Sequence, residues 1–216
     1  MFGKHTRLYV LQRSTLVSIL CAAMIAFLPH FARAGPLGDC EQLKNPPLAI
    51  RACSRLISDI PGSAVFHNRR GIAYLRNGEI DNAIADYTEA IHLDPRATEA
   101  YYNRGRAQLE KKAYTAAILD FDHAVARTPS HPLALNARAW AIFKLGNLAA
   151  ALEEADYAIA ADARYAPAYD TRAHIYEALG KREQAVADFR KALALDPHDP
   201  LVHITREGLR RLRAAP

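Results

Sequence analysis

The chain has 216 residues, of which 50% are hydrophobic and 24% charged, so it contains enough apolar material for a packed core. Its formal net charge is +5, but residues 1–34 hold four basic side chains (Lys4, Arg7, Arg13 and Arg33) and no acidic one. Taking those four from the 28 basic residues leaves 24 against 23 acidic residues. Because basic and acidic residues are nearly equal in number, the composition gives no argument for binding to nucleic acid.

Residues 1–34 have the pattern of a secretory signal peptide. Basic residues precede a short apolar run, LVSILCAAMIAFL, and the sequence ARA at positions 32–34 is a small-x-small cleavage site. The run is shorter than the roughly 20 residues of a membrane-spanning helix. We therefore expect a periplasmic or secreted protein with no transmembrane span after cleavage, with retention as an N-terminal anchor as the alternative.

The remainder of the chain is periodic. An arginine returns at one constant interval, at Arg70, Arg104, Arg138, Arg172 and Arg206. Four segments of that length align without an insertion, namely residues 64–97, 98–131, 132–165 and 166–199. Self-similarity at such a period is typical of repeats that stack to bury a continuous core.

The aligned columns indicate that each repeat is a helical hairpin. A column of small residues, which lets two helices approach closely, consists of Gly71, Gly105, Ala139 and Ala173. An aromatic column with one alanine gap consists of Tyr87, Phe121, Ala155 and Phe189. Prolines end three repeats, and glycines that tolerate positive φ separate the two halves at Gly78, Gly146 and Gly180. The predicted helices are residues 64–77 and 80–93, 98–111 and 114–127, 132–145 and 148–161, and 166–179 and 182–195.

These columns resemble the tetratricopeptide repeat (TPR) family in their period and in their small, aromatic, alanine and proline positions. The resemblance implies an all-α fold, a right-handed superhelical α-solenoid of helix-turn-helix TPR repeats. It implies four repeats over residues 64–199, preceded by a cysteine-containing capping half repeat at residues 35–63. Residues 200–216 are expected to form a C-terminal capping helix.

Two cysteines, Cys40 and Cys53, follow the predicted signal peptide. An oxidising compartment favours a disulfide between them, with two free thiols as the alternative. In the repeat frame Cys53 takes the aromatic slot, so Cys40 would attach the preceding segment to the capping half repeat. No CxxC motif or Cys/His cluster points to a metal site.

A second column offers acidic partners to the arginines, at Asp86, Asp120, Glu154 and Asp188. We expect ion pairs between helices, which set the register of the stack. A basic stripe that binds an acidic partner or phosphate is the alternative.

The family resemblance places the first helix of each repeat on a concave face. The residues expected to form a partner-binding groove there are Asn68, Arg69, Tyr102, Asn103, Arg106, Asn136, Trp140, Phe143, Lys144, Asp170 and His174. Asparagines can hold the backbone of an extended peptide, and aromatic side chains are common binding hot spots. Core packing is the alternative for Trp140. The clamp by which chaperone-docking members hold a C-terminal carboxylate is absent.

No catalytic or cofactor-binding motif is recognised, and the scattered histidines are expected to be solvated. We therefore expect a non-enzymatic module without cofactors that binds a protein or peptide in its groove, as an adaptor or assembly factor of the bacterial cell envelope. The alternatives are a self-associating scaffold and an accessory subunit of an envelope enzyme. The arginine-rich end, with Arg206, Arg210, Arg211 and Arg213, is a further candidate for contact with an acidic surface or anionic lipid.

Overall fold

The structure is a computed structural model, which describes residues 35–198 and 202–214. These residues form eleven α-helices and no strand. The helices are α2 (Pro36–Glu41), α3 (Pro46–Asp59), α4 (Ala64–Arg76), α5 (Ile80–Leu93), α6 (Thr98–Glu110), α7 (Tyr114–Arg127), α8 (Pro132–Lys144), α9 (Leu148–Ala161), α10 (Ala166–Ala178), α11 (Arg182–Leu195) and α12 (Val202–Ala214). Within these ranges no helix has both the length and the hydrophobicity needed to cross a membrane. The predicted signal peptide lies outside the described residues.

The four predicted helical hairpins are confirmed. The helix pairs α4–α5, α6–α7, α8–α9 and α10–α11 make the most extensive contacts in the described chain. Each second helix has its predicted bounds, and each first helix ends one residue earlier than predicted, where a capping residue follows. Ahead of the first repeat, residues 35–63, which were predicted to form a capping half repeat, contain α3 and also a short helix, α2, which the sequence pattern did not separate from it.

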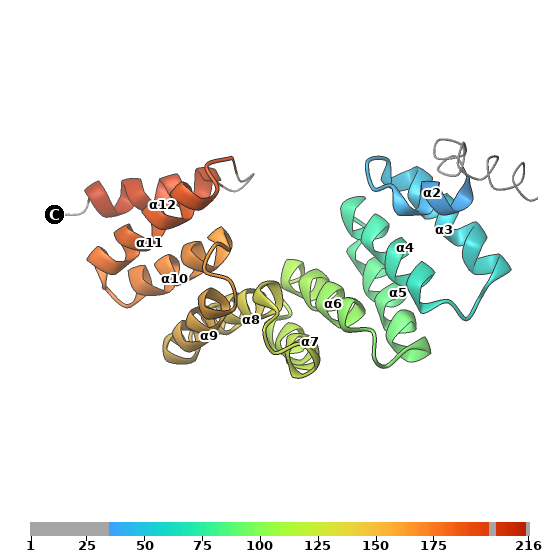
Figure 1. Cartoon of the computed structure of the whole chain (residues 1–216), viewed down its shortest axis with the longest axis horizontal. Coiled ribbons are helices and arrows are strands. Elements are labelled where there is room, and N and C mark those ends of the chain that lie inside the picture. Colours follow the sequence, from blue (N-terminus) through green and yellow to red (C-terminus); the bar gives the residue numbers. More distant parts are fainter. Residues whose placement is uncertain (1–34, 199–201, 215–216) are drawn as a thin grey trace, which may run out of the picture.

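The hairpins follow one another along an arc, with α2 and α3 at one tip and α12 at the other (Figure 1). Consecutive first helices touch, α4 with α6, α6 with α8 and α8 with α10. Consecutive second helices make no comparable contact within the described residues. The first helices therefore line the inner side of the arc, and the second helices splay on its outer side.

The turn inside each repeat requires one residue with positive φ. Gly78, Gly146 and Gly180 adopt φ values of 80°, 86° and 72°. The second repeat has Lys112 at the same position, with φ of 59°. An L-residue with a side chain is less favourable there than glycine, so this turn is held by the helices on either side of it.

Within a repeat, the small column allows the aromatic column to pack directly against the first helix. A Cβ atom added at Gly71 would lie 2.6 Å from Tyr87 Cε1, and one added at Gly105 would lie 2.7 Å from Phe121 Cε1. Tyr87, Phe121 and Phe189 are fully buried. The rings fill the space between the two helices of a hairpin, and this is why the residue opposite them must be small.

The third repeat solves the same packing problem with a residue from its neighbour. Its aromatic slot holds Ala155, and the small column holds Ala139, so neither side chain fills the space between α8 and α9. Ile175 of α10 is fully buried against both alanines. The other full repeats have alanine at the position of Ile175, so a larger side chain in the fourth repeat compensates for the smaller one in the third.

We expect Ile175→Ala to destabilise the protein by about 3 kcal/mol, because it removes the large side chain that fills this site. Urea unfolding followed by circular dichroism measures the loss. The matched control is Ile204→Ala, on a partly exposed isoleucine, which should cost less than about 0.5 kcal/mol. Adding Ala155→Phe to the Ile175→Ala variant should restore part of the loss. Equal stability of Ile175→Ala and wild type would contradict this account of the third repeat.

Candidate functional site

The residues predicted to form the groove all lie on the first helices α4, α6, α8 and α10, which line the inner side of the arc. They differ in how far they remain available to a partner. Two of them, Arg106 and Lys144, are exposed, and the other nine are half-buried. The groove is therefore a surface on which a few side chains protrude above a largely packed floor.

Part of the floor holds neighbouring repeats together. The amide of Asn103 donates to Asn68 Oδ1 at 3.1 Å, which links α6 to α4. The hydroxyl of Thr205 donates to Asp170 Oδ1 at 2.6 Å and links α12 to α10 in the same way. Asn68, Asn103 and Asp170 were predicted as partner-binding groups, and in the structure each of them also has a structural hydrogen bond.

The middle of the groove combines two cations with aromatic rings. Lys144 Nζ lies 4.9 Å from the Trp140 ring centre and 5.8 Å from that of Phe143, and these two rings are 5.3 Å apart. The guanidinium of Arg106 lies 5.9 Å from the Tyr102 ring centre. Neither cation has an ion pair among the described residues. We call Arg106, Trp140, Phe143 and Lys144 the groove centre.

Tyr102 is held more firmly than its sequence position suggested. Its ring lies 6.1 Å from that of Phe121 and 5.4 Å from that of His131. Burial raises the pKa of the Tyr102 phenol, and the positive charge of Arg106 acts in the opposite direction. Tyr102 therefore forms part of the wall beneath Arg106.

The expectation that the histidines are solvated is wrong for His67 and His174. His67 is buried, and its Nδ1 lies 3.2 Å from Asp86 Oδ1. The side chain of His174 is 12% exposed, with carboxylate oxygens of Asp170 and Glu177 each 3.6 Å from a ring nitrogen. His174 also packs edge-on against Trp140 and Phe189. Both histidines lie where helices meet, which a single sequence does not show.

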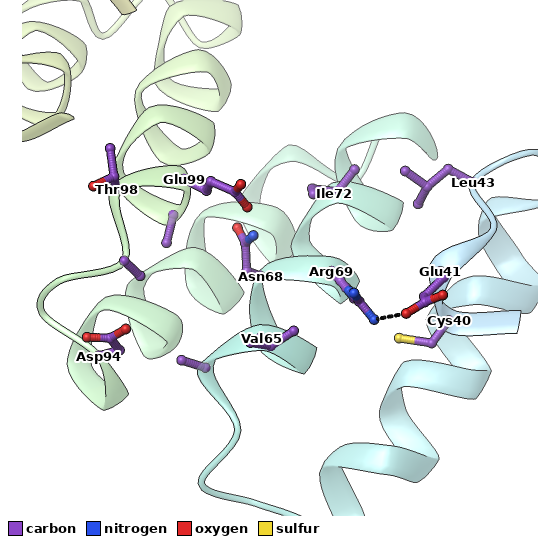
Figure 2. Close-up of a pocket in the computed structure, with 13 residues that line it drawn as sticks. Cys40, Glu41, Leu43, Val65, Asn68, Arg69, Ile72, Asp94, Thr98 and Glu99 are labelled. Carbon is purple, nitrogen blue, oxygen red and sulfur yellow. Dashed lines mark hydrogen bonds and ion pairs between the residues drawn. The ribbon is translucent and has the colours of Figure 1, made fainter. Parts of the chain in front are cut away.

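A hollow of about 520 Å³ opens at the N-terminal end of the inner face, between α2, α4 and the start of α6 (Figure 2). Its lining includes Asn68, Arg69, Ile72 and Glu99. One wall is α2, where Glu41 Oε1 accepts a hydrogen bond from Arg69 Nη1 at 2.7 Å. A predicted groove residue is thus paired within the chain.

The same wall is attached covalently to the repeats. Cys40 of α2 and Cys53 of α3 form a disulfide, and both side chains are fully buried. Leu56 and Phe66 pack against them. Because α2 has only six residues, its position depends on this bond and on the contacts around it.

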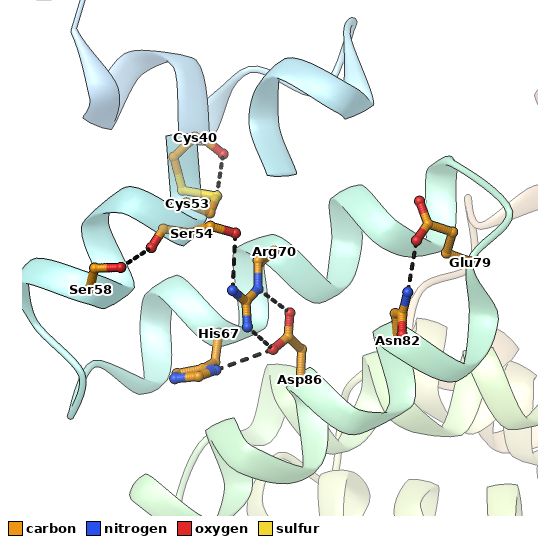
Figure 3. Close-up of polar contacts among 9 residues, drawn as sticks. All are labelled: Cys40, Cys53, Ser54, Ser58, His67, Arg70, Glu79, Asn82 and Asp86. Carbon is orange, nitrogen blue, oxygen red and sulfur yellow. Dashed lines mark hydrogen bonds and ion pairs between the residues drawn. A yellow bond between two sulfur atoms is a disulfide. The ribbon is translucent and has the colours of Figure 1, made fainter. Parts of the chain in front are cut away.

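One arginine from each of the four repeats lies on the side of the first helix that faces the second helix. These arginines form a regular ladder, which consists of Arg70, Arg104, Arg138 and Arg172. In the first repeat, Arg70 Nε and Nη2 each donate to Asp86 at 2.7 Å, and Nη1 donates to Ser54 Oγ at 3.0 Å (Figure 3). Ser54 lies on α3, Arg70 on α4 and Asp86 on α5. One guanidinium therefore joins three successive helices.

This arrangement is repeated with the same spacing. Each arginine bonds one residue 16 positions before it and one 16 positions after it. The earlier partners are Ser54, Thr88, Asp122 and Asp156, and the later ones are Asp86, Asp120, Glu154 and Asp188. The hydrogen bonds to Asp120 raise the pKa of Arg104, although burial acts in the opposite direction.

Arg206 departs from the ladder in which the sequence placed it. It is exposed, and it has no hydrogen bond or ion pair among the described residues. The position that corresponds to the earlier partner is Arg190, a like charge. No helix of the described chain follows α12 to offer the later partner. The fifth arginine therefore meets neither of the partners that hold the other four.

No group of three or more His, Cys, Asp or Glu side chains in the described part of the chain is arranged to hold a metal ion. The side chains of the groove centre are suited to non-covalent contact, through two cations and an aromatic surface.

We expect removal of the disulfide to loosen the wall of the N-terminal hollow. The double variant Cys40→Ala, Cys53→Ala should lose about 3 kcal/mol of stability, and the amides of residues 39–42 should exchange hydrogen at least about tenfold faster. Amides of α10 serve as the internal control. Unchanged exchange in α2 would mean that Glu41–Arg69 and apolar packing suffice to hold it.

We expect the ladder to be sensitive to loss of one partner. Asp120→Asn should destabilise the protein by about 3 kcal/mol, because it leaves a partly buried guanidinium without its counter-charge. Glu110→Gln, at an exposed acid, is the control and should change stability by less than about 0.5 kcal/mol. Chemical denaturation measures both. If both variants lose the same small amount of stability, the ladder ion pair does not contribute more to stability than an exposed surface charge does.

The comparisons with known proteins agree on one family. Models of the tetratricopeptide repeat match residues 68–132, 120–167 and 166–199. Mouse serine/threonine-protein phosphatase 5 is 36% identical over 64 residues, which are 30% of this chain and 13% of that protein, so the chain spans only a small part of this relative. The structure of a protein named MamA is 26% identical, with a TM-score of 0.64 over 70% of this chain and 89% of that one.

A second structural neighbour is described as a thermophilic TPR protein of Thermus thermophilus. It is 27% identical, with a TM-score of 0.62, and the match covers 69% of this chain and 81% of that one. The period, the hairpins, the packing of the small and aromatic columns and these matches agree. The chain belongs to the tetratricopeptide repeat family.

Proposed function

We propose that this protein binds a segment of another protein along the inner face of its arc, without enzymatic activity, as an adaptor or assembly factor of the bacterial cell envelope. The observation that carries the proposal is the groove centre. There, Arg106 and Lys144 are exposed, each lies over an aromatic ring, and neither has an acidic partner among the described residues.

The chemistry of the groove centre is that of a contact surface. A cation held over a ring can pair with a carboxylate of a bound segment while the ring covers an adjacent apolar side chain. The floor beneath it is fixed by hydrogen bonds between repeats and by the packing of Tyr102 and His174. A partner would thus meet a surface that is already ordered, which lowers the entropic cost of binding.

An envelope location is supported by two features of different kinds. Residues 1–34 have the pattern of a signal peptide. The disulfide between Cys40 and Cys53 is a bond that persists in oxidising compartments.

Site-specific photo-crosslinking in living cells tests the proposal. A photoreactive amino acid at Lys144 should capture a discrete protein, recovered in the periplasmic fraction. The matched control is Lys191, also an exposed lysine beside an aromatic ring (6.0 Å from Tyr169) but on the outer helix α11. Adding Trp140→Ala should reduce the capture at Lys144 several-fold, because it removes the apolar contact.

The contrary outcomes are distinct. Equal capture at Lys144 and Lys191, or none at either, would refute groove binding. Capture of a second copy of the chain at Lys144 would support the self-associating scaffold instead. A captured partner in the cytoplasmic fraction would refute the envelope location and leave groove binding intact.

A further inference from the structure

The last described helix presents a side that is covered in every full repeat. In each of these repeats, the side of the first helix that carries the ladder arginine is covered by the second helix of the same repeat. The helix α12 has the register of a first helix, with Arg206 in the ladder position. No helix in the described part of the chain packs across its equivalent side, which is therefore open.

The open side is basic. Arg206 and Arg210 are exposed on α12, and Arg190 is exposed on α11 at the register position from which the earlier repeats supply Ser, Thr or Asp. These three arginines have no hydrogen bond or ion pair among the described residues. A hollow on α12 is lined by His203, Arg206, Leu209 and Arg210. We call this surface, with Glu207 at its middle, the C-terminal face.

The repeat register indicates what fits such a face. Four times in this chain, the ladder arginine receives a carboxylate from a helix that packs across it. Arg206 has the same position on its helix, but no described helix crosses it. We propose that the C-terminal face docks an acidic helix of another protein, which supplies the carboxylate for the fifth position of the ladder. This surface is separate from the groove centre and does not depend on it.

Glu207 limits which acidic helices can dock on the C-terminal face. Glu207 stands in register with Gly71, Gly105, Ala139 and Ala173, where a small residue admits the ring of the second helix. A glutamate there excludes a helix with an aromatic side chain in that slot. The docking helix therefore resembles α9, which has Ala155 in the slot and the acid Glu154 beside it.

Charge argues against a second copy of the chain as the occupant. A symmetric pair of copies would bring Arg206 and Arg210 of both chains together, and a head-to-tail stack would approach Arg51 and Arg55, which are exposed on α3. Like charges at an interface oppose association. Charge alone does not separate an acidic helix from an anionic membrane surface, because the three arginines outnumber Glu207, but the ladder register favours the helix. An acidic helix can place its carboxylate at Arg206 and a small residue at Glu207.

A peptide with the sequence of α9, LAAALEEADYAIAA, provides a defined probe, because it has three acidic residues and no Lys or Arg. Stapled to hold its helix and labelled with a fluorophore, it should bind the full-length protein, with an affinity that falls as salt is added. Arg206→Glu should weaken binding at least about tenfold. Arg164→Glu, at an exposed arginine in the turn before α10, is the matched control and should leave the affinity within about twofold.

A gain of binding tests the role of Glu207. The α5 sequence, IDNAIADYTEAIHL, is also acidic but has Tyr87 in the aromatic slot, so it should bind the wild-type protein poorly. Glu207→Ala, which restores a small residue, should strengthen binding of the α5 peptide at least about fivefold. A general electrostatic attraction would instead treat the α5 and α9 peptides alike in both proteins.

Three outcomes would overturn the proposal. The first is that neither peptide binds, or that both bind equally to wild type and Arg206→Glu. The second is that Arg206→Glu abolishes binding to vesicles containing phosphatidylglycerol, measured against neutral vesicles, while the α9 peptide does not bind. The third is a dimer by light scattering that Arg206→Glu dissociates. Because Arg206 and Glu207 are exposed, we expect the variants to fold, and circular dichroism checks that they do.

Discussion

The rest of the structure depends on a single contact between helices, in which one guanidinium joins three of them. Each of the four ladder arginines bonds the second helix of its own repeat and the helix just before that repeat, which is α3 for Arg70 and the second helix of the preceding repeat for Arg104, Arg138 and Arg172. An arginine suits this role because its planar group carries several donors in a fixed geometry. Since such partly buried charges contribute more to register than to stability, the ladder sets how each hairpin sits on the next.

Once the ladder has set the register, the apolar packing between hairpins can vary. The third repeat lacks its aromatic side chain, and Ile175 of the next repeat fills the space. The second repeat lacks its turn glycine, and Lys112 takes the positive φ. Each deviation is tolerated because a repeat is held by its neighbours on both sides, which is a property of stacked repeats in general. A repeat can therefore lack one of its usual residues where an adjacent repeat makes up for the lost packing or holds the turn.

The stacking of repeats also divides the polar surface into groups that are bonded within the chain and groups that remain exposed. Polar groups of the inner face that face a neighbouring repeat, such as Asn103 and Asp170, are already bonded within the chain. Cations that point away from the neighbours, such as Arg106 and Lys144, are exposed and have no ion pair among the described residues. On α12 no described helix completes the ladder, and Arg206 there is the equivalent of Arg172 without a partner among the described residues.

The amino-acid sequence by itself determined the repeat and, to within one residue, the bounds of the helices in the four repeats, because a constant period states the same local pattern four times. It also indicated which arginine and which acid are in register, and which two cysteines could pair. Only the tertiary structure decided which groove residues remain exposed, that His67 is buried and His174 is largely covered, and that Ile175 belongs to the core of the repeat before it. These features depend on contacts between residues of different helices. The spacing along one chain fixes the face of a helix on which a side chain lies, but not what packs against that face.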